Sequence, residues 1–137
     1  MTVVTTSRKP LPEVRTLARD LAFAIGGDYV TRGKAGMHDL LAPDQPLVIV
    51  SKAGSYFSIQ IFSSDEPGPS VDITIRSFSV EERAGAIARG IFTSEGSIYE
   101  TLKDYIEPLF IDKDLPGRHQ IAFDGRQRKH YTLEVVP

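Results

Sequence analysis

Residues 3–25 combine a short β-branched run with a helical spacing of apolar positions. The run Val-Val-Thr-Thr at residues 3–6 favours a strand. Pro12 suits the first position of a helix, and Gly26-Gly27 suits its end. The apolar residues between them recur at intervals of three and four; they are Val14, Leu17, Ala18, Leu21, Ala22 and Ile25. The pattern predicts a strand that leads into an amphipathic helix.

The chain up to residue 75 continues with alternating apolar runs and turns. A short extended run at residues 28–30, a short helical candidate at residues 37–41 and an apolar run at residues 47–51 complete a β-α-β-α-β outline. Alternating apolar residues at 57–61 and 71–75 predict two half-buried strands. Because polar residues with two prolines and a glycine separate them, these strands are predicted to pair antiparallel.

The next part holds an ambiguous stretch and a second predicted helix. Residues 80–92 fit a helix or a strand, and Gly85 and Gly90 weaken both, so this stretch stays unassigned. The segment Ser97-Ile-Tyr-Glu100 has the form of a capping box and predicts the start of a helix that Pro108 ends or bends. Its apolar positions are Ile98, Leu102, Tyr105, Ile106 and Leu109.

The C-terminal segment completes the fold prediction. Residues 120–123 and 131–136 predict two strands joined across Asp124-Gly125. No short repeat or long linker divides the chain. The order of elements predicts an α/β fold, in which residues 1–137 form a single domain with one mixed sheet and flanking helices.

Composition excludes several classes of protein. A chain of 137 residues with 41% hydrophobic residues has the usual size of one globular domain. It has no apolar run long enough to span a membrane and no secretory signal, so we expect a cytoplasmic protein. The absence of cysteine excludes disulfides, thiolate catalysis, iron–sulfur clusters and zinc sites that use cysteine.

Charge is divided unevenly along a chain of net charge −2. Residues 1–52 carry seven Lys or Arg against five Asp or Glu, whereas residues 53–137 carry nine against thirteen. The basic residues of the first part concentrate in Arg8, Lys9, Arg15, Arg19, Arg32 and Lys34. A second, smaller basic group consists of Arg126, Arg128 and Lys129. A solvated surface explains such groups better than a bound ligand does, because clustered surface Lys and Arg are common without one, so charge alone names no partner.

The residues that could carry chemistry match no known catalytic or metal-binding pattern. The segment Thr31-Arg-Gly-Lys-Ala35 invites comparison with a P-loop, but Asp28 stands at the position of its first glycine and Ala35 at that of its magnesium-binding hydroxyl. The three histidines lack the spacing of a metal pair, and no nucleophile elbow surrounds Ser7. We therefore predict no catalytic residue, metal or cofactor.

Two segments of the first part together carry a recognisable pattern. The first is Thr5-Thr-Ser-Arg-Lys-Pro10, which precedes the basic amphipathic helix, and the second is Tyr29-Val-Thr-Arg-Gly-Lys34. An apolar strand at residues 47–50 follows in order, and residues 97–110 end in a Leu-Phe pair. This order and spacing resemble the N-terminal signature of the Brix-domain family and one of its later helices. The specific part of the resemblance covers residues 3–52.

The resemblance implies a ribosome-biogenesis factor of the short archaeal type, which binds ribosomal RNA precursors without catalysis. It also implies two similar α/β halves, each like the anticodon-binding domain of class II aminoacyl-tRNA synthetases. The matching positions, which are the implied RNA-binding residues, are Ser7, Arg8, Lys9, Arg32, Gly33 and Lys34, together with Arg15 and Arg19 on the first helix. Two departures concern the helix starts: Leu11 replaces a common capping residue, and Gly36-Met37 replaces the usual Ser-Leu. Tyr29 and Tyr56 are candidates for base stacking, although such tyrosines more often belong to the core.

Two other hypotheses come from different functional classes. The acidic second half, with Glu81, Glu82, Asp112 and Asp114, could dock a ribosomal or processing protein, which would make RNA contact incidental. An enzyme acting on a small anionic ligand would rest only on the turn at residues 32–34 and would require a defined pocket. The resemblance favours RNA binding over both.

Overall fold

The computed structural model describes residues 2–34, 36–43 and 45–137, without the side chains of residues 37 and 38. Its elements are β1 (Val3–Thr6), α1 (Pro12–Ile25), β2 (Asp28–Tyr29), α2 (Met37–Leu40), β3 (Leu47–Ala53), β4 (Tyr56–Phe62), β5 (Val71–Glu82), β6 (Ile91–Thr93), α3 (Gly96–Leu102), β7 (Leu109–Ile111), β8 (Gln120–Asp124) and β9 (Lys129–Val135). The predicted β-α-β-α-β order and both antiparallel pairs are confirmed. None of the helices in the described ranges combines the length and apolar character needed to cross a bilayer.

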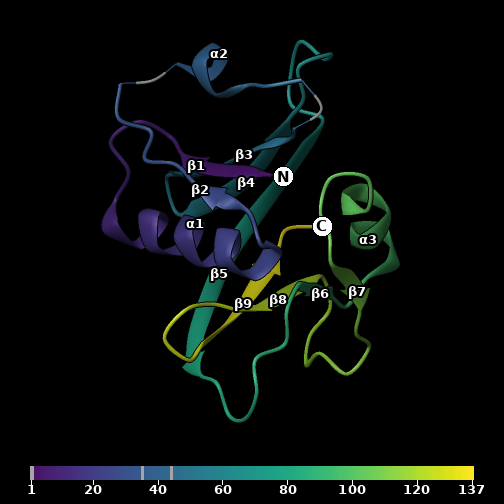
Figure 1. Cartoon of the computed structure of the whole chain (residues 1–137). Coiled ribbons are helices and arrows are strands. Elements are labelled where there is room, and N and C mark those ends of the chain that lie inside the picture. Colours follow the sequence, from purple (N-terminus) through teal and green to yellow (C-terminus); the bar gives the residue numbers. More distant parts are fainter. Residues whose placement is uncertain (1, 35, 44) are drawn as a thin grey trace.

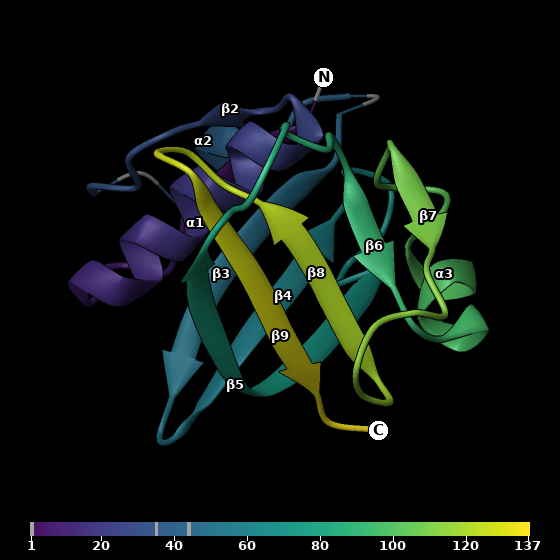
Figure 2. The ribbon, with the colours of Figure 1, turned by 90° about the horizontal axis from the view of Figure 1, so that it is seen from below.

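The described strands form one sheet in the order β2-β1-β3-β4-β5-β9-β8-β6-β7. Figure 1 and Figure 2 show the molecule from two sides. This order is mirrored about β5, which therefore belongs to two halves: β1 to β4 with α1 on one side, and β6 to β9 with α3 on the other. Parallel pairing joins β1 to β2 and β3, and β6 to β7; the other pairs are antiparallel. The predicted mixed α/β sheet with flanking helices is confirmed.

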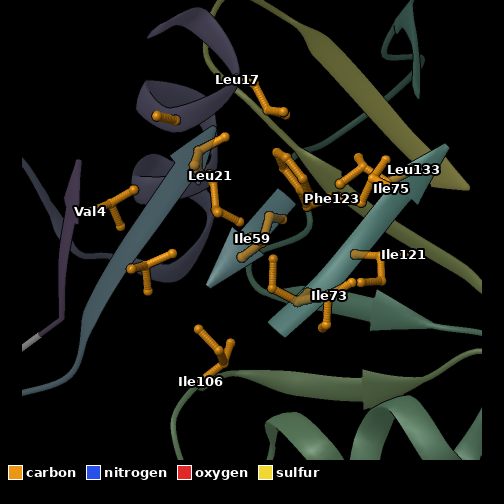
Figure 3. Packing of buried hydrophobic residues seen from close by; sticks show 14 of the residues in the cluster. Val4, Leu17, Leu21, Ile59, Ile73, Ile75, Ile106, Ile121, Phe123 and Leu133 are labelled. Carbon is orange, nitrogen blue, oxygen red and sulfur yellow. The ribbon is translucent and has the colours of Figure 1, made fainter. Parts of the chain in front are cut away.

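One hydrophobic core serves both halves of the molecule. Figure 3 shows Leu17 and Leu21 of α1 in the same cluster as Ile59 of β4, Phe123 of β8 and Ile106, which follows α3. All five side chains are buried. Because strands from both sides of β5 contribute to this cluster, the two halves share the main core. A smaller cluster of Leu47, Ile49 and Phe62 belongs to the first half alone.

The stretch left unassigned at residues 80–92 divides into three parts. Residues 80–82 extend β5, which pairs with β4 through its first half and with β9 through its second half, across a bulge. Residues 83–90 are irregular, and residues 91–93 form β6. Gly90 has φ 106°, a backbone conformation that favours glycine, which explains why neither regular pattern continued through it.

The predicted second helix exists, but both of its ends were wrong. Glu95 occupies the N-cap position of α3 without a side-chain cap, so the Ser97–Glu100 segment forms no capping box. α3 ends before the Leu109-Phe110 pair, which lies in β7 and pairs with β6. α3 ends at Leu102, where the N–H groups of Tyr105 and Ile106 both bond to the Leu102 carbonyl and close a turn. Pro108, six residues later, lacks an N–H and disfavours helical backbone in the residue before it, so the helix does not resume.

Candidate nucleic-acid interface

Two basic loops leave the same end of the sheet. Because β1 is parallel to β2 and β3, the carboxyl ends of these strands lie together. The β1–α1 loop carries Ser7, Arg8 and Lys9, and the β2–α2 loop carries residues 32–34; both loops lie on the left in Figure 1. The fold therefore brings six of the predicted site residues to one end of the molecule, which we call the basic end.

Arg32 closes the carboxyl end of β1. Its Nη1 donates a hydrogen bond to the carbonyl oxygen of Thr6 at 3.1 Å. Upstream, the Val30 N–H donates to the Val4 carbonyl at 2.9 Å, and Thr5 Oγ1 donates to the Val30 carbonyl at 2.6 Å. These bonds hold the start of the β2–α2 loop against β1, so Arg32 has a structural contact as well as its place in the basic end.

Arg8 reaches from the first loop toward the second. A Cβ placed on Gly36 would lie 3.9 Å from Nη2 of Arg8 and 3.6 Å from Oδ2 of Asp39. The Gly36 N–H donates to the same Asp39 oxygen at 2.9 Å, which orders the entry into α2. Both separations are ordinary van der Waals distances, so the guanidinium of Arg8 lies beside this turn and a Cβ at position 36 would not displace it. Ala35 lies outside the described residues.

Both loops contain a residue with left-handed backbone. Lys9 has φ 52° and Gly33 has φ 54°. Glycine adopts this conformation without steric cost, whereas it is uncommon for lysine. The turns leave the side chains of Arg8, Lys9 and Lys34 exposed, so their charges face solvent at the basic end.

A surface hollow lies between the first loop, the start of α1 and the β3–β4 hairpin. It is lined by Ser7, Arg8, Lys9, Pro10, Leu11, Val14, Lys52 and Gly54. Lys52 was missed by the sequence reasoning, although its place at the end of the strand next to β1 could have identified it. Its Nζ lies 2.9 Å from Oε1 of Glu13 and 5.1 Å from the ring centroid of Phe57. Leu11 is the N-cap residue of α1 and makes no capping hydrogen bond through its side chain.

Arg15 and Arg19 extend the basic surface along α1. Both are exposed, and they lie one helical turn apart. The guanidinium carbon of Arg19 lies 5.1 Å from the ring centroid of Tyr29, a half-buried residue of β2. Tyr29 therefore packs against an arginine, whereas Tyr56 is exposed on β4. Arg15 lies next to Val14, which lines the hollow, while Arg19 lies further along the helix.

The basic group of the last hairpin contacts a buried carboxylate. Asp20 of α1 accepts hydrogen bonds from the Arg126 N–H at 3.0 Å, from Arg126 Nε at 2.7 Å and from the Tyr131 hydroxyl. Lys129 Nζ lies 3.7 Å from Oδ2 of Asp20. Burial opposes ionisation of Asp20, but the bonds from Tyr131 and Arg126 outweigh it and lower its pKa. Burial, followed by the bond to Asp20, raises the pKa of Tyr131.

Close approach at Gly125 makes this contact possible. A Cβ at position 125 would lie 2.8 Å from Cγ of Asp20 and 2.8 Å from Cε1 of Tyr131. Arg128 also faces the protein: its Nη2 donates to the Arg83 carbonyl at 3.3 Å, and its Nε lies 3.6 Å from Oε1 of Glu82. The basic group at residues 126–129 thus binds the second half to α1 and to the end of β5.

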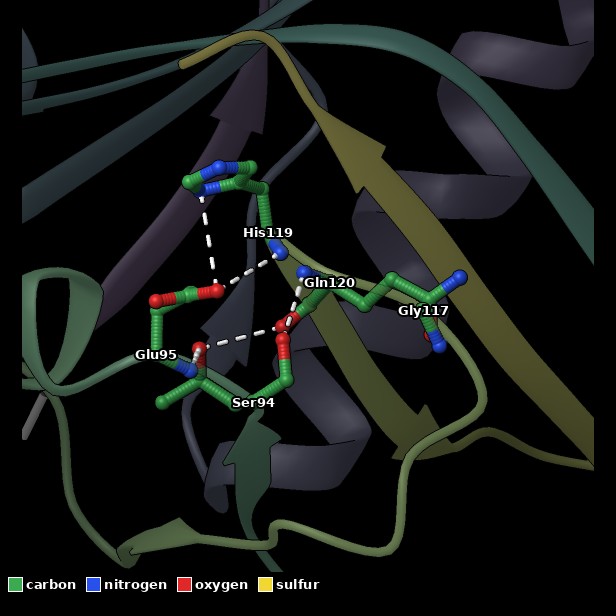
Figure 4. Close-up of polar contacts among 6 residues, drawn as sticks. Ser94, Glu95, Gly117, His119 and Gln120 are labelled. Atoms are coloured by element: carbon green, nitrogen blue, oxygen red, sulfur yellow. Dashed lines mark hydrogen bonds and ion pairs between the residues drawn. The ribbon is translucent and has the colours of Figure 1, made fainter.

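Polar side chains of the second half also serve internal contacts, as Figure 4 shows. Ser94 Oγ accepts from the Gln120 N–H at 2.9 Å, and Glu95 Oε1 accepts from the His119 N–H at 3.3 Å. His130 Nδ1 lies 2.7 Å from Oδ1 of Asp124. In the described part of the chain, no three His, Cys, Asp or Glu side chains form a possible metal site. The side chain of His38 lies outside the described residues.

Comparisons with known proteins support a resemblance to Brix-domain proteins, in sequence over part of the chain and in fold over nearly all of it. The chain is 44% identical over 52 residues to a probable Brix domain-containing ribosomal biogenesis protein of Methanosarcina barkeri. That match covers 36% of this chain and 33% of the relative, so it spans about a third of the relative's length. No family model matches the chain.

A solved structure matches nearly the whole of this chain. The crystal structure of Mil, an archaeal Imp4-like protein, superposes with a TM-score of 0.59 at 18% identity, and covers 98% of this chain and 96% of that one. At 18% sequence identity, this structural similarity establishes the fold alone. Together with the curated relative, it confirms the resemblance to the Brix-domain family.

Proposed function

We propose that this chain is a non-catalytic ribosome-biogenesis factor, a Brix domain over residues 1–137, that binds ribosomal RNA precursors in the cytoplasm. The observation that carries the proposal is the convergence of two basic loops at one end of the sheet. The name of the curated relative supports a role in ribosome biogenesis. Ribosome-assembly proteins are the other partners that this role implies.

The basic end suits the phosphate backbone of RNA. Arg8, Lys9 and Lys34 are exposed there, Arg32 lies behind them against Thr6, and Lys52 lies across the hollow. Arginine can bind phosphate oxygens through two N–H groups, and lysine acts as a point charge. Several phosphates along a folded RNA could therefore contact this end together, and such contacts carry little sequence information.

The division of charge favours one orientation on RNA. Residues 1–52, which include the basic end, have two more basic than acidic residues, whereas residues 53–137 have four more acidic than basic residues. An RNA that approaches the molecule is attracted by the first part and repelled by the second. We therefore propose that α1, with Arg15 and Arg19, lies along the RNA while the β6–β7 edge points away.

The proposal can be tested by replacing Lys9 and Lys34 with Ala, since both are exposed and neither makes an ion pair within the described residues. Binding to a structured ribosomal RNA fragment would be measured by fluorescence anisotropy across a salt series. Each lost phosphate contact should reduce the log-log salt slope by roughly 0.7 to 0.9 and weaken binding to all sequences.

The matched control replaces two exposed basic residues of the second half, Lys113 and Arg118, with Ala. This variant removes the same charge but should keep the salt slope of the original chain. A tRNA of similar length tests for preference. Equal slopes for the two double variants would mean that net charge, and not the basic end, determines RNA binding.

A further inference from the structure

The edge strand β7 exposes apolar side chains. It is the last strand of the sheet, on the right in Figure 2, and among the described strands it pairs with β6 alone. Phe110 and Ile111 are each 46% exposed. Edge strands of soluble proteins are usually protected by charged side chains, proline or a covering segment, because an open edge can pair with another chain. β7 carries apolar residues at the position where such protection is expected.

The main chain of β7 presents free hydrogen-bonding groups. The Ile91 N–H donates to the Pro108 carbonyl at 2.9 Å, and the Asp112 N–H donates to the Thr93 carbonyl at 2.8 Å. Alternate residues of a parallel strand face the same neighbour, so the main-chain groups of Leu109 and Ile111 point away from β6. No backbone bond to another described element satisfies them. An added strand could therefore bond to the N–H and carbonyl groups of both residues.

The side chains of β7 make the two faces of this edge different. The ring of Phe110 stacks on Phe92 of β6, with centroids 5.2 Å apart. Ile111 lies on the opposite face of the strand, because successive side chains alternate. An added strand would meet an aromatic surface on one face and an aliphatic side chain on the other, which suits a segment with apolar residues at alternate positions.

Carboxylates flank β7 along the chain. Glu107 precedes the strand, and Asp112 and Asp114 follow it, with one basic residue, Lys113, between them. None of these four takes part in an ion pair among the described residues. This surface repels phosphate and attracts cations, so its charge favours a basic polypeptide over RNA.

We propose that the β7 edge binds an extended segment of a protein, rich in Lys or Arg, as an additional strand of the sheet. Main-chain bonds to Leu109 and Ile111 fix the segment, and Phe110 and Ile111 pack against its apolar side chains. The carboxylates that flank β7 along the chain pair with its charges. This site is separate from the basic end, so it does not depend on RNA binding there. The molecule would then hold an RNA at one end and a basic protein segment at the other.

The test uses the whole chain labelled with ¹⁵N and a synthetic peptide that alternates Lys and Val. Amide signals of residues 109–112, and of the paired β6, should shift on titration, and the shifts should weaken as salt is added. A peptide with Glu in place of Lys, and one with N-methylated backbone groups, should each bind at least about tenfold more weakly, because they lose the charge pairing or the strand bonds.

Two variants assign the effect to the edge. Ile111→Pro removes an outward N–H and leaves the pairing with β6, a place where an edge strand tolerates proline. It should weaken peptide binding about tenfold or more. Phe110→Ser should also weaken binding, whereas Tyr56→Ser, at a residue of similar exposure (47%) on β4, should not. If either edge variant unfolds, the shift map of the unaltered chain still decides.

Three results would overturn the proposal: no shift at residues 109–112, equal binding of the Lys and Glu peptides, or equal shifts of these residues by a ribosomal RNA fragment. Loss of RNA binding in the Lys9 and Lys34 double variant, with peptide binding kept, would show that the two sites fail independently.

Discussion

Asp20 is the residue on which the joining of the two halves most depends. Its buried carboxylate accepts three hydrogen bonds from the last hairpin. We expect Asp20→Asn to lower the free energy of unfolding by about 2 to 4 kcal/mol, because the amide leaves donors of Arg126 and Tyr131 poorly matched in a buried place. Urea unfolding at neutral pH measures this, with the exposed Asp28→Asn as control. Equal losses in the two variants would contradict the role of Asp20.

Because its pKa is lowered, the contribution of Asp20 to the stability of the fold depends on pH. A carboxyl that is more acidic in the folded than in the unfolded chain stabilises the fold above the unfolded pKa of about 3.9. That stability is lost as the pH falls through the folded pKa. The difference in unfolding free energy between the original chain and Asp20→Asn should therefore be largest above about pH 5 and should shrink toward pH 2. A difference that grows on acidification would mean that the charge of Asp20 destabilises the fold.

Position 125 requires glycine because the side chains of Asp20 and Tyr131 lie too close for a Cβ. An added methyl would lie 2.8 Å from side-chain atoms of Asp20 and Tyr131. Gly125→Ala should therefore cost about 1 to 3 kcal/mol of stability through displacement of α1 or the hairpin. Gly68→Ala is the matched control, because a Cβ there meets nothing within 4 Å. The midpoint of thermal unfolding should be lower for Gly125→Ala than for Gly68→Ala. Equal midpoints would show that the hairpin accommodates the added methyl group without loss of stability.

At the scale of elements, α1 begins without the side-chain cap that many helices have. Leu11, at its N-cap, is 51% exposed and makes no capping bond. Leu11→Thr should add a bond to a first-turn N–H and stabilise the chain by about 0.5 to 1 kcal/mol relative to Leu11→Ala. Comparing the two variants by urea unfolding separates capping from loss of the leucine side chain. Equal stability would show that backbone geometry at residue 11 prevents capping.

The elements that the sequence predicted correctly have long periodic patterns or clear turn residues. The α1 helix and the β4–β5 pair are of this kind. The helix predicted from Ser97 was too long, because Ile106 and Leu109 continue its apolar spacing although they enter the core through a turn and a strand. Local periodicity could not show that residues after Pro108 would pair with β6.

For the whole molecule, the sequence predicted the two loops of the basic end but not all of the residues that lie around them. The resemblance named both loops, and parallel pairing of β1 and β2 brought them together. Lys52 lies outside both signature loops, although the parallel pairing of β3 with β1 brings it to the same end. Charge alone named no partner for Arg126 and Lys129, which face Asp20, a residue more than one hundred positions away in sequence. Such pairs depend on how the halves pack, which a single sequence does not encode locally.

We propose that the two basic loops, and not the β7 edge, contact RNA. The most direct measurement titrates the ¹⁵N-labelled chain with a structured ribosomal RNA fragment at moderate salt and follows the amide signals. We predict shifts in residues 7–9, residues 32–34 and Lys52, with β7 unchanged. Shifts centred on β7, or no shift at either basic loop, would contradict the account.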